Sequence, residues 1–255
     1  MIHLRENKII TPFSDLIIPK PKFFMPWRAM MAAAGAGAAQ ASYFFDEDNS
    51  EYLAIPGHSS LALGADEFTV ECWFRITSGS TVDDKLLIGQ GTTGGVDNTE
   101  WCLFLNSDRV EFRTQGGGIS IQWSSAVSTA TWYHVMVTRD SSDVIRLFVD
   151  GDEKASTTSS NDFSATTNVQ VGYNANDSKT PFDGNIDEIR VLKSAAAQTG
   201  NFTPPTEDYT SDANTSLLIH CNEAVSGEDF TDSGNIGHTI TETNGANQDT
   251  TTYKY

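Results

Sequence analysis

Apolar and polar residues alternate along much of the chain after residue 43. The segment 68–76, FTVECWFRI, places five apolar side chains on one face and Thr69, Glu71, Trp73 and Arg75 on the other. A period of two is typical of an antiparallel strand with one buried face. Further strands are predicted over residues 85–89, 101–105, 109–113, 119–123, 132–138, 145–150, 168–172 and 186–192.

Turn-forming residues separate these segments. Clusters of Gly, Asn, Asp and Thr lie around residues 92–98 and 116–118, and the dipeptide Asp150-Gly151 indicates a hairpin. The body has one helix candidate, of one or two turns, over residues 194–198, and residues 199–214 are expected to cross the surface. Many short strands with frequent turns predict an all-β sandwich or barrel.

The first 42 residues differ from the body. Residues 1–40 hold five basic and two acidic residues and four of the eight prolines. We interpret residues 1–42 as an extended docking arm with a short helix over 27–34. Its candidate contact residues are Arg5, Lys8, Lys20, Lys22, Trp27 and Arg28. Residues 23–41 are also similar to the end of a signal peptide, but Pro26 and Arg28 interrupt the apolar region, which favours the arm.

Composition excludes several classes of protein. The net charge of −18 argues against direct nucleic-acid binding, which normally requires a basic patch. No run of 18 apolar residues is present, so no transmembrane helix is expected. The three cysteines, Cys72, Cys102 and Cys221, are too few for a disulfide framework and are predicted to be buried free thiols. This usage fits folding in a reducing cytosol.

Several segments, taken in their order along the chain, resemble those of a known protein family. FTVECWFRI is followed by WYHVMVTRD (132–140), IRLFVDG (145–151), VGYN (171–174) and FDGNIDEIRVL (182–192). Over about residues 43–198 this set resembles the laminin-G-like branch of the concanavalin A-like lectin/glucanase superfamily. The resemblance implies an antiparallel jelly-roll β-sandwich. Within it, His134 is expected to pack at the start of a core strand, Gly184 to permit a tight turn, and Asp187 to cap backbone amides or pair with an arginine.

The C-terminal segment occupies an unexpected position in the sequence. Residues 216–241 resemble the segment that usually opens such a domain, yet here they follow the body. Residues 217–220 and 236–241 are therefore expected to complete the sandwich in cis, as in a circular permutation, or in trans in a neighbouring subunit. A truncated second repeat is the third alternative. Completion is favoured over truncation because an unpaired edge strand promotes aggregation. Of the two forms of completion, the cis form is preferred.

The sequence lacks recognisable catalytic motifs. Glycosidases of this superfamily carry alternating carboxylates on one strand, and no such spacing occurs here. Asp187 and Glu188 are adjacent, so they are expected to point to opposite faces of a strand. No Ser/His/Asp elbow is found, and none of the five histidines is paired at metal-ligand spacing. We therefore expect a protein without enzymatic activity.

Two loops suggest a calcium site. Residues 95–105 and 171–184 resemble the two ligand loops of pentraxins, which share this fold. Carried over, the resemblance implies Asp97, Asn98, Asn174, Asn176 and Asp177 as calcium ligands, with fewer charges than a pentraxin offers. The alternative is that these are ordinary turn residues.

Aromatic side chains provide candidates for stacking on a sugar ring. Trp101, Trp123 and Tyr173 are the candidate glycan-binding residues, although a tryptophan in a sandwich also serves to fill the core.

These observations lead to a hypothesis about function. The chain is expected to be a virion structural protein of a tailed bacteriophage, a tail or neck fibre, spike or head decoration assembled in the host cytoplasm. It would display a laminin-G-like adhesion module to glycans on a host surface and bind other virion proteins through residues 1–42. Its oligomeric state, a homo-oligomer included, stays open. The alternative is a secreted calcium-dependent carbohydrate-binding module.

Overall fold

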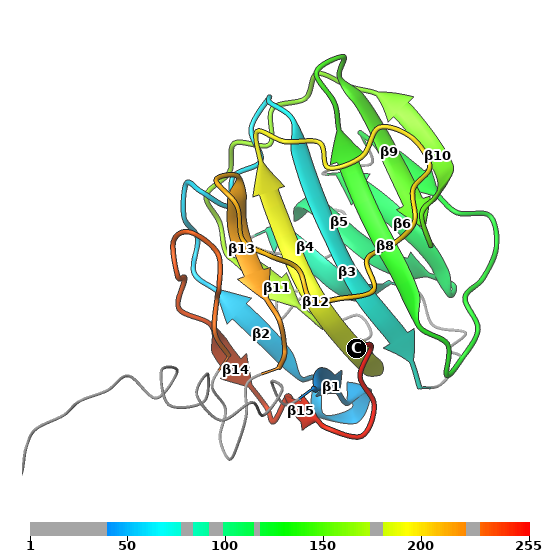
Figure 1. The fold of residues 1–255 in the computed structure, drawn as a ribbon, viewed down its shortest axis with the longest axis vertical. Helices are drawn as coiled ribbons and strands as arrows, with labels where there is room; N and C mark the ends of the chain where they lie inside the picture. The colour runs from blue at the N-terminus through cyan, green and yellow to red at the C-terminus, as the bar shows by residue number, and fades with distance from the viewer. Residues whose placement is uncertain (1–39, 78–83, 92–98, 115–117, 174–180, 223–229) are drawn as a thin grey trace, which may run out of the picture. The chain divides into compact units, whose positions relative to one another are not determined.

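The computed structural model describes residues 40–77, 84–91, 99–114, 118–173, 181–222 and 230–255. Two antiparallel sheets stack face to face in these residues (Figure 1). Sheet A has the strand order β10 (Asp152–Thr158), β9 (Val144–Val149), β8 (Tyr133–Arg139), β3 (Phe68–Ile76), β12 (Gly184–Lys193), β1 (Ser42–Phe45) and β15 (Asn247–Asp249), with β13 (Thr215–Ile219) also paired to β12. Sheet B has the order β14 (Thr241–Thr243), β2 (Tyr52–Ile55), β11 (Val169–Val171), β4 (Lys85–Gly91), β5 (Thr99–Asn106), β6 (Arg109–Thr114) and β7 (Ser120–Gln122).

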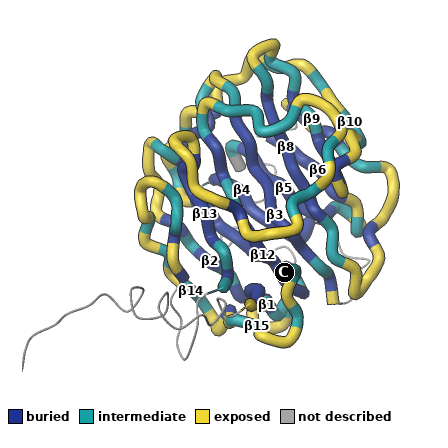
Figure 2. Tube along the Cα trace, viewed as in Figure 1, coloured by how far each residue is buried: buried dark blue, intermediate teal, exposed yellow. Residues whose placement is uncertain are grey.

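The core lies between the two sheets, where the alternating apolar faces meet. On β3, Val70, Cys72 and Phe74 are fully buried in this core, which confirms the predicted alternation. Figure 2 shows the central strands of both sheets as buried and the connections around them as largely exposed. The described part of the chain is thus an all-β sandwich, and all three cysteines in it are buried and free, as predicted.

Every strand predicted from residue 85 to residue 192 is present. The prediction missed β10, whose sequence DEKASTT is mostly polar. This strand lies at the edge of sheet A, where a polar surface is favoured because it discourages pairing with other chains. A short 3-10 turn, η1 (Glu47–Asn49), was also not expected. No helix among the described residues is long and apolar enough to cross a membrane.

Strand β12 connects the body to the C-terminal segment. It pairs along its length with β3, and its other side pairs with β1 and then with β13. Strand β14 pairs with β2, and β15 pairs with β1. The C-terminal strands therefore complete both sheets in cis, as favoured from the sequence. The predicted strand over 236–241 is displaced, because β14 begins at Thr241 and Ile236 is 51% exposed.

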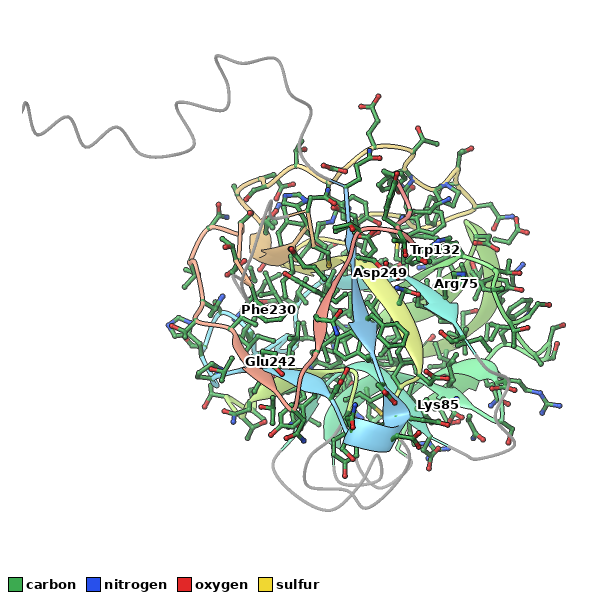
Figure 3. All side chains as sticks on the ribbon, turned by 90° about the horizontal axis from the view of Figure 1, so that it is seen from below. Arg75, Lys85, Trp132, Phe230, Glu242 and Asp249 are labelled. Carbon is green, nitrogen blue, oxygen red and sulfur yellow. The ribbon has the colours of Figure 1, made fainter. Side chains whose placement is uncertain are left out.

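Side chains reinforce this closure. The ring of Phe230 lies 4.6 Å from that of Tyr43 on β1, measured between centroids. Asn185 on β12 donates from Nδ2 to the carboxylate of Asp249 at 3.1 Å. Figure 3 shows Asp249 on β15, the strand beside β1. Residues 38–255 form one compact unit, so the predicted divisions 43–198 and 199–255 fold together.

The connection over residues 199–214 runs across the outer face of sheet A (Figures 1 and 2). It brings Tyr209 onto a buried ionic network. The carboxylate of Glu71 accepts from Arg190 Nε at 2.8 Å, from the Tyr209 hydroxyl at 3.0 Å, and bonds His134 Nε2 at 3.1 Å. Burial acts to raise the pKa of Glu71, but the hydrogen bond with His134 and the charge of Arg190 together lower it. Glu71 and Trp73 therefore face away from the core, as predicted, yet both are buried. Tyr209 of the connection covers Glu71, whereas the C-terminal residues Lys254 and Tyr255 pack on the Trp73 ring.

Two local expectations were wrong. No helix forms over residues 194–198, because the hydroxyl of Thr69 takes up the local backbone groups by donating to Ala195 O and accepting from Ala197 N. Gly184 lies within β12 rather than in a tight turn. Its φ is 148°, and a Cβ there would lie 2.1 Å from the carbonyl oxygen of Arg75, so the close approach of β3 requires glycine. The hairpin at Asp150-Gly151 is confirmed, with φ angles of 52° and 81°.

The bond between Tyr209 and Glu71 gives a test of this buried layer. Tyr209→Phe removes a hydroxyl that donates to a buried carboxylate, so the free energy of unfolding is expected to fall by about 1.5–3 kcal/mol. Urea denaturation measures the change. Tyr253→Phe is the matched control, because Tyr253 is 40% exposed and should leave stability unchanged. Equal stability of the two variants would contradict the arrangement.

Candidate functional site

An aromatic patch lies at the open edge of the sandwich, where β7 and β10 contact each other. Trp123 follows β7 directly, and its backbone N–H donates to Val110 O at 2.9 Å. Its indole is partly buried against the core, with its centroid 6.1 Å from the Tyr133 ring. Lys154 on β10 holds its Nζ 5.5 Å from the Trp123 ring centroid. We define Trp123, Tyr133 and Lys154 as the edge patch.

Polar groups surround the edge patch. Lys154 pairs with Asp152 at 3.2 Å, and the Tyr133 hydroxyl accepts from Ser128 N at 3.0 Å. Gln122, the residue before Trp123, points to the other face of the strand, where it donates to the buried carboxylate of Glu111 at 3.2 Å. A partly buried ring with an accessible edge, bordered by hydrogen-bonding groups, can contact the apolar face of a sugar while those groups bond its hydroxyls.

The other two glycan-binding candidates lie elsewhere. Trp101 is fully buried, and its Nε1 donates to Gln90 Oε1 at 3.1 Å, so it fills the core and presents no ring to a ligand. Tyr173 is half-buried and makes an edge contact with Tyr52 at 6.0 Å between centroids. It follows β11, which lies four strand positions from β7 in sheet B. At about 4.8 Å per position, Tyr173 and Trp123 are on the order of 19 Å apart across the sheet.

A bulge in β12 overturns the expectation for Asp187 and Glu188. Glu188 has a φ of 50°, and the pairing register with β3 shifts between Asp187 and Arg190. Both carboxylates therefore lie on the outer side of sheet A. Asp187 accepts from Glu188 N at 2.9 Å and from Lys254 N at 3.1 Å, which confirms its predicted role in capping backbone amides. Glu188 bonds Tyr209 N at 2.8 Å and His220 Nδ1 at 2.9 Å.

The same region holds a cluster of metal-ligating types. One ligand atom each from Glu188, Asp208 and His220 lie within 4.8 Å of one another. These residues come from the bulge, from the connection over 199–214 and from the end of β13, so no sequence spacing indicated them. Because His220 and the backbone of Tyr209 already occupy the oxygens of Glu188, the cluster serves in this structure to fasten the connection to the sheet.

A second constellation was also missed. Ser60 Oγ lies 2.8 Å from His238 Nε2, and His238 Nδ1 lies 2.7 Å from Asp232 Oδ2. The sequence has no serine elbow, but the fold brings these three residues together from separate loops. Ser60 follows β2, whereas Asp232 and His238 lie between β13 and β14.

A family model described as the concanavalin A-like lectin/glucanases superfamily, of laminin G type, matches residues 47–199. The chain belongs to this superfamily. A search of curated protein sequences found no significant match to this laminin G-like chain.

Two solved structures share the fold of the laminin G-like chain. A Bacteroides ovatus protein proposed to bind carbohydrate is 18% identical with a TM-score of 0.55, and the match covers 84% of this chain but only 60% of that protein. The heptameric SAP-like pentraxin of Limulus polyphemus is 11% identical with a TM-score of 0.51, and the match covers 84% of this chain and 96% of the pentraxin. At these identities the matches establish the fold alone.

Several predicted site residues lie outside the described residues of the laminin G-like chain. They include every proposed calcium ligand (Asp97, Asn98, Asn174, Asn176 and Asp177) and every proposed contact of the arm (Arg5, Lys8, Lys20, Lys22, Trp27 and Arg28). Calcium binding and docking by the arm therefore stay predictions.

The bulge gives the laminin G-like chain an unusual pH dependence. Burial raises the pKa of Asp187 to about 8. The hydrogen bond from the backbone of Lys254 lowers this pKa, and the negative charge of Glu188 raises it further. An unfolded aspartate has a pKa of about 3.9. At a pH between these two pKa values, the carboxyl group of Asp187 is ionised in the unfolded chain but protonated in the folded chain. The free energy of unfolding should therefore fall as pH rises from about 4 to about 8.

Asp187→Asn removes this titration. Relative to the wild type, the variant is therefore expected to gain stability with rising pH, by at most about 1.4 kcal/mol per pH unit across that window. Urea denaturation at several pH values measures the difference, with Asp48→Asn, a change at an exposed aspartate of η1, as the control. Parallel curves for wild type and Asp187→Asn would show that Asp187 is ionised in the folded protein.

Proposed function

We propose that this chain is a carbohydrate-binding adhesion module, displayed on a tailed-bacteriophage virion and held there by residues 1–42. The observation that carries the binding proposal is the edge patch, because it presents a partly buried indole among hydrogen-bonding groups on a lectin-type fold. The Bacteroides ovatus protein of similar fold, itself proposed to bind carbohydrate, supports the same class of ligand.

Charge restricts the ligand. The chain carries a net charge of −18, and such a field repels polyanions at low ionic strength. Neutral glycans on a host surface are therefore the favoured ligands. Because the sequence lacks the alternating carboxylates of a glucanase, the module is proposed to bind these glycans without cleaving their glycosidic bonds.

The virion part of the proposal rests on the arm. Residues 1–40 are basic and proline-rich, whereas the rest of the chain is strongly acidic. This asymmetry favours an arm that docks on an acidic surface of other virion proteins. The alternative, a secreted calcium-dependent carbohydrate-binding module, is supported by the resemblance of residues 95–105 and 171–184 to pentraxin loops. Loss of glycan binding on chelation would favour this alternative.

Replacement of the indole tests the binding surface. Trp123→Ala is expected to weaken binding of the recognised glycan by roughly 10- to 30-fold, since truncation of a tryptophan anchor costs about 2 kcal/mol. Isothermal titration calorimetry on the folded variant measures the affinity. Tyr253→Ala, which removes an exposed aromatic ring outside the patch, is the control and should bind normally. Unchanged affinity of Trp123→Ala would place the glycan site elsewhere.

Removal of the arm tests the anchoring. A chain lacking residues 1–40 is expected to keep the unfolding midpoint of the full-length protein, because β1 begins at Ser42. It should also be absent from purified virus particles, as measured by immunoblot. A truncated chain that still joins the particles would refute the anchoring role.

A further inference from the structure

Asp232 holds His238 in one orientation. Oδ1 of Asp232 accepts from Leu218 N at 2.9 Å and from Gly234 N at 2.8 Å. Oδ2 accepts from the backbone N–H of His238 at 2.8 Å and from its Nδ1 at 2.7 Å. Both side chains are nearly inaccessible, at 0% exposure for Asp232 and 5% for His238. The imidazole is therefore fixed by a fully bonded, buried carboxylate.

This arrangement makes Nε2 of His238 an acceptor. A carboxylate oxygen accepts hydrogen bonds, so Nδ1 carries the proton of the neutral ring and Nε2 is left with a lone pair. Nε2 lies 2.8 Å from the hydroxyl of Ser60. A second imidazole, His58, places its Nδ1 2.8 Å from the same hydroxyl, but this nitrogen also accepts from Ser60 N at 3.2 Å. The two imidazole nitrogens therefore compete for the single hydrogen of the Ser60 hydroxyl. Of the two rings, His238 is the one held by a buried carboxylate, that of Asp232.

Ser60 opens onto a cavity. An open cavity of about 270 Å³ is lined by Ser60, Lys193, Asn214, Asn235 and Ile236, among others. Lys193 Nζ donates to Ser59 O at 2.9 Å, which fixes a positive charge in the wall beside Ser60. Ile236 is 51% exposed and offers an apolar contact. The cavity is small, so it suits a short acyl group better than a whole sugar chain.

We propose that Ser60 is the nucleophile of a carboxylic-ester hydrolase site, with His238 as its general base and Asp232 as the residue that positions His238. The substrate class is an ester of a short acyl group, such as an O-acetyl ester. This activity goes beyond glycan binding and departs from the sequence-based expectation of a protein without enzymatic activity. A purely structural network would bury its serine, whereas here the serine is the end of the array that faces a cavity.

The reaction balances without a cofactor. Ser60 Oγ bonds to the carbonyl carbon while its proton passes to His238 Nε2. The carbon–oxygen bond to the alcohol then breaks, and His238 returns the proton to the departing alkoxide. Water attacks the acyl-serine, gives its proton to His238, and releases the carboxylic acid as Ser60 regains its hydrogen. The ammonium of Lys193 is the positive group in the cavity wall that can stabilise the oxyanion.

A fluorophosphonate probe tests for the nucleophile directly, because it phosphonylates activated serine hydroxyls. The full-length chain is expected to gain one phosphonyl group, with loss of fluoride from the probe and of the proton from the hydroxyl, on the peptide that contains Ser60, as measured by mass spectrometry. Ser60→Ala should lose this label completely. The neighbouring exposed serine provides the matched control, so Ser59→Ala should be labelled at the wild-type rate.

The same assay identifies the base. Loss of a general base typically slows reaction by about 100-fold or more, so His238→Gln should slow labelling by that factor. His58→Ala should slow it far less. Hydrolysis of p-nitrophenyl acetate should follow the same order of variants. Unfolding midpoints show whether each variant is folded.

An unlabelled wild-type protein, or equal labelling of Ser60→Ala, would overturn the proposal. If the probe labels His238→Gln as fast as the wild type, His238 is not the general base. None of these readouts depends on glycan binding, so failure of the ester hydrolase and failure of the adhesion module are distinguishable.

Discussion

The bulge at Glu188 is the constraint on which the rest of the sheet A surface depends. One extra residue in β12 lets Ile186 and Ile189 both enter the core, while Asp187, Glu188 and Arg190 all reach the outer side. Arg190 then meets Glu71 of β3, and Glu188 binds the backbone of Tyr209. The connection over residues 199–214 is held on the sheet by these bonds.

Because the outer side of sheet A is covered, ligands must bind elsewhere on the described surface. The outer side of sheet A near β3, β8 and β12 is covered by the connection and by the C-terminal residues, with Lys254 Nζ 3.9 Å from the centroid of the Trp73 ring. Within the described residues, the proposed activities therefore lie at other places. The edge patch lies where β7 meets β10, and the cavity of Ser60 lies beside the loops that join β2 to β3 and β13 to β14.

Much of the fold could be predicted from the sequence because burial enforces alternation. The side chains of residues 68–76 lie on the faces that the alternation predicts. The need to cover strand edges predicts that the C-terminal strands complete the sandwich, and the structure shows that they do so in cis. The failures have local causes. Strand β10 is an edge strand with few apolar residues, and the bulge at Glu188 breaks the period of two that placed Asp187 and Glu188 on opposite faces.

The candidate sites were harder to predict than the fold. Trp101 and Trp123 both occur in strand patterns, and only the register and the edge position of β7 show that the first is fully buried and the second only partly buried. Ser60, Asp232 and His238 are brought together by the pairing of β14 with β2, over a separation of more than 170 residues. No motif within one segment can signal such a contact.

A crystal structure of the full-length chain with the oligosaccharide that it binds most tightly would test the central claim most directly. The account predicts a sugar ring stacked on the indole of Trp123, with hydroxyls bonded to groups around the edge patch. An oligosaccharide bound on another surface, or the absence of any bound glycan in a broad screen, would contradict it.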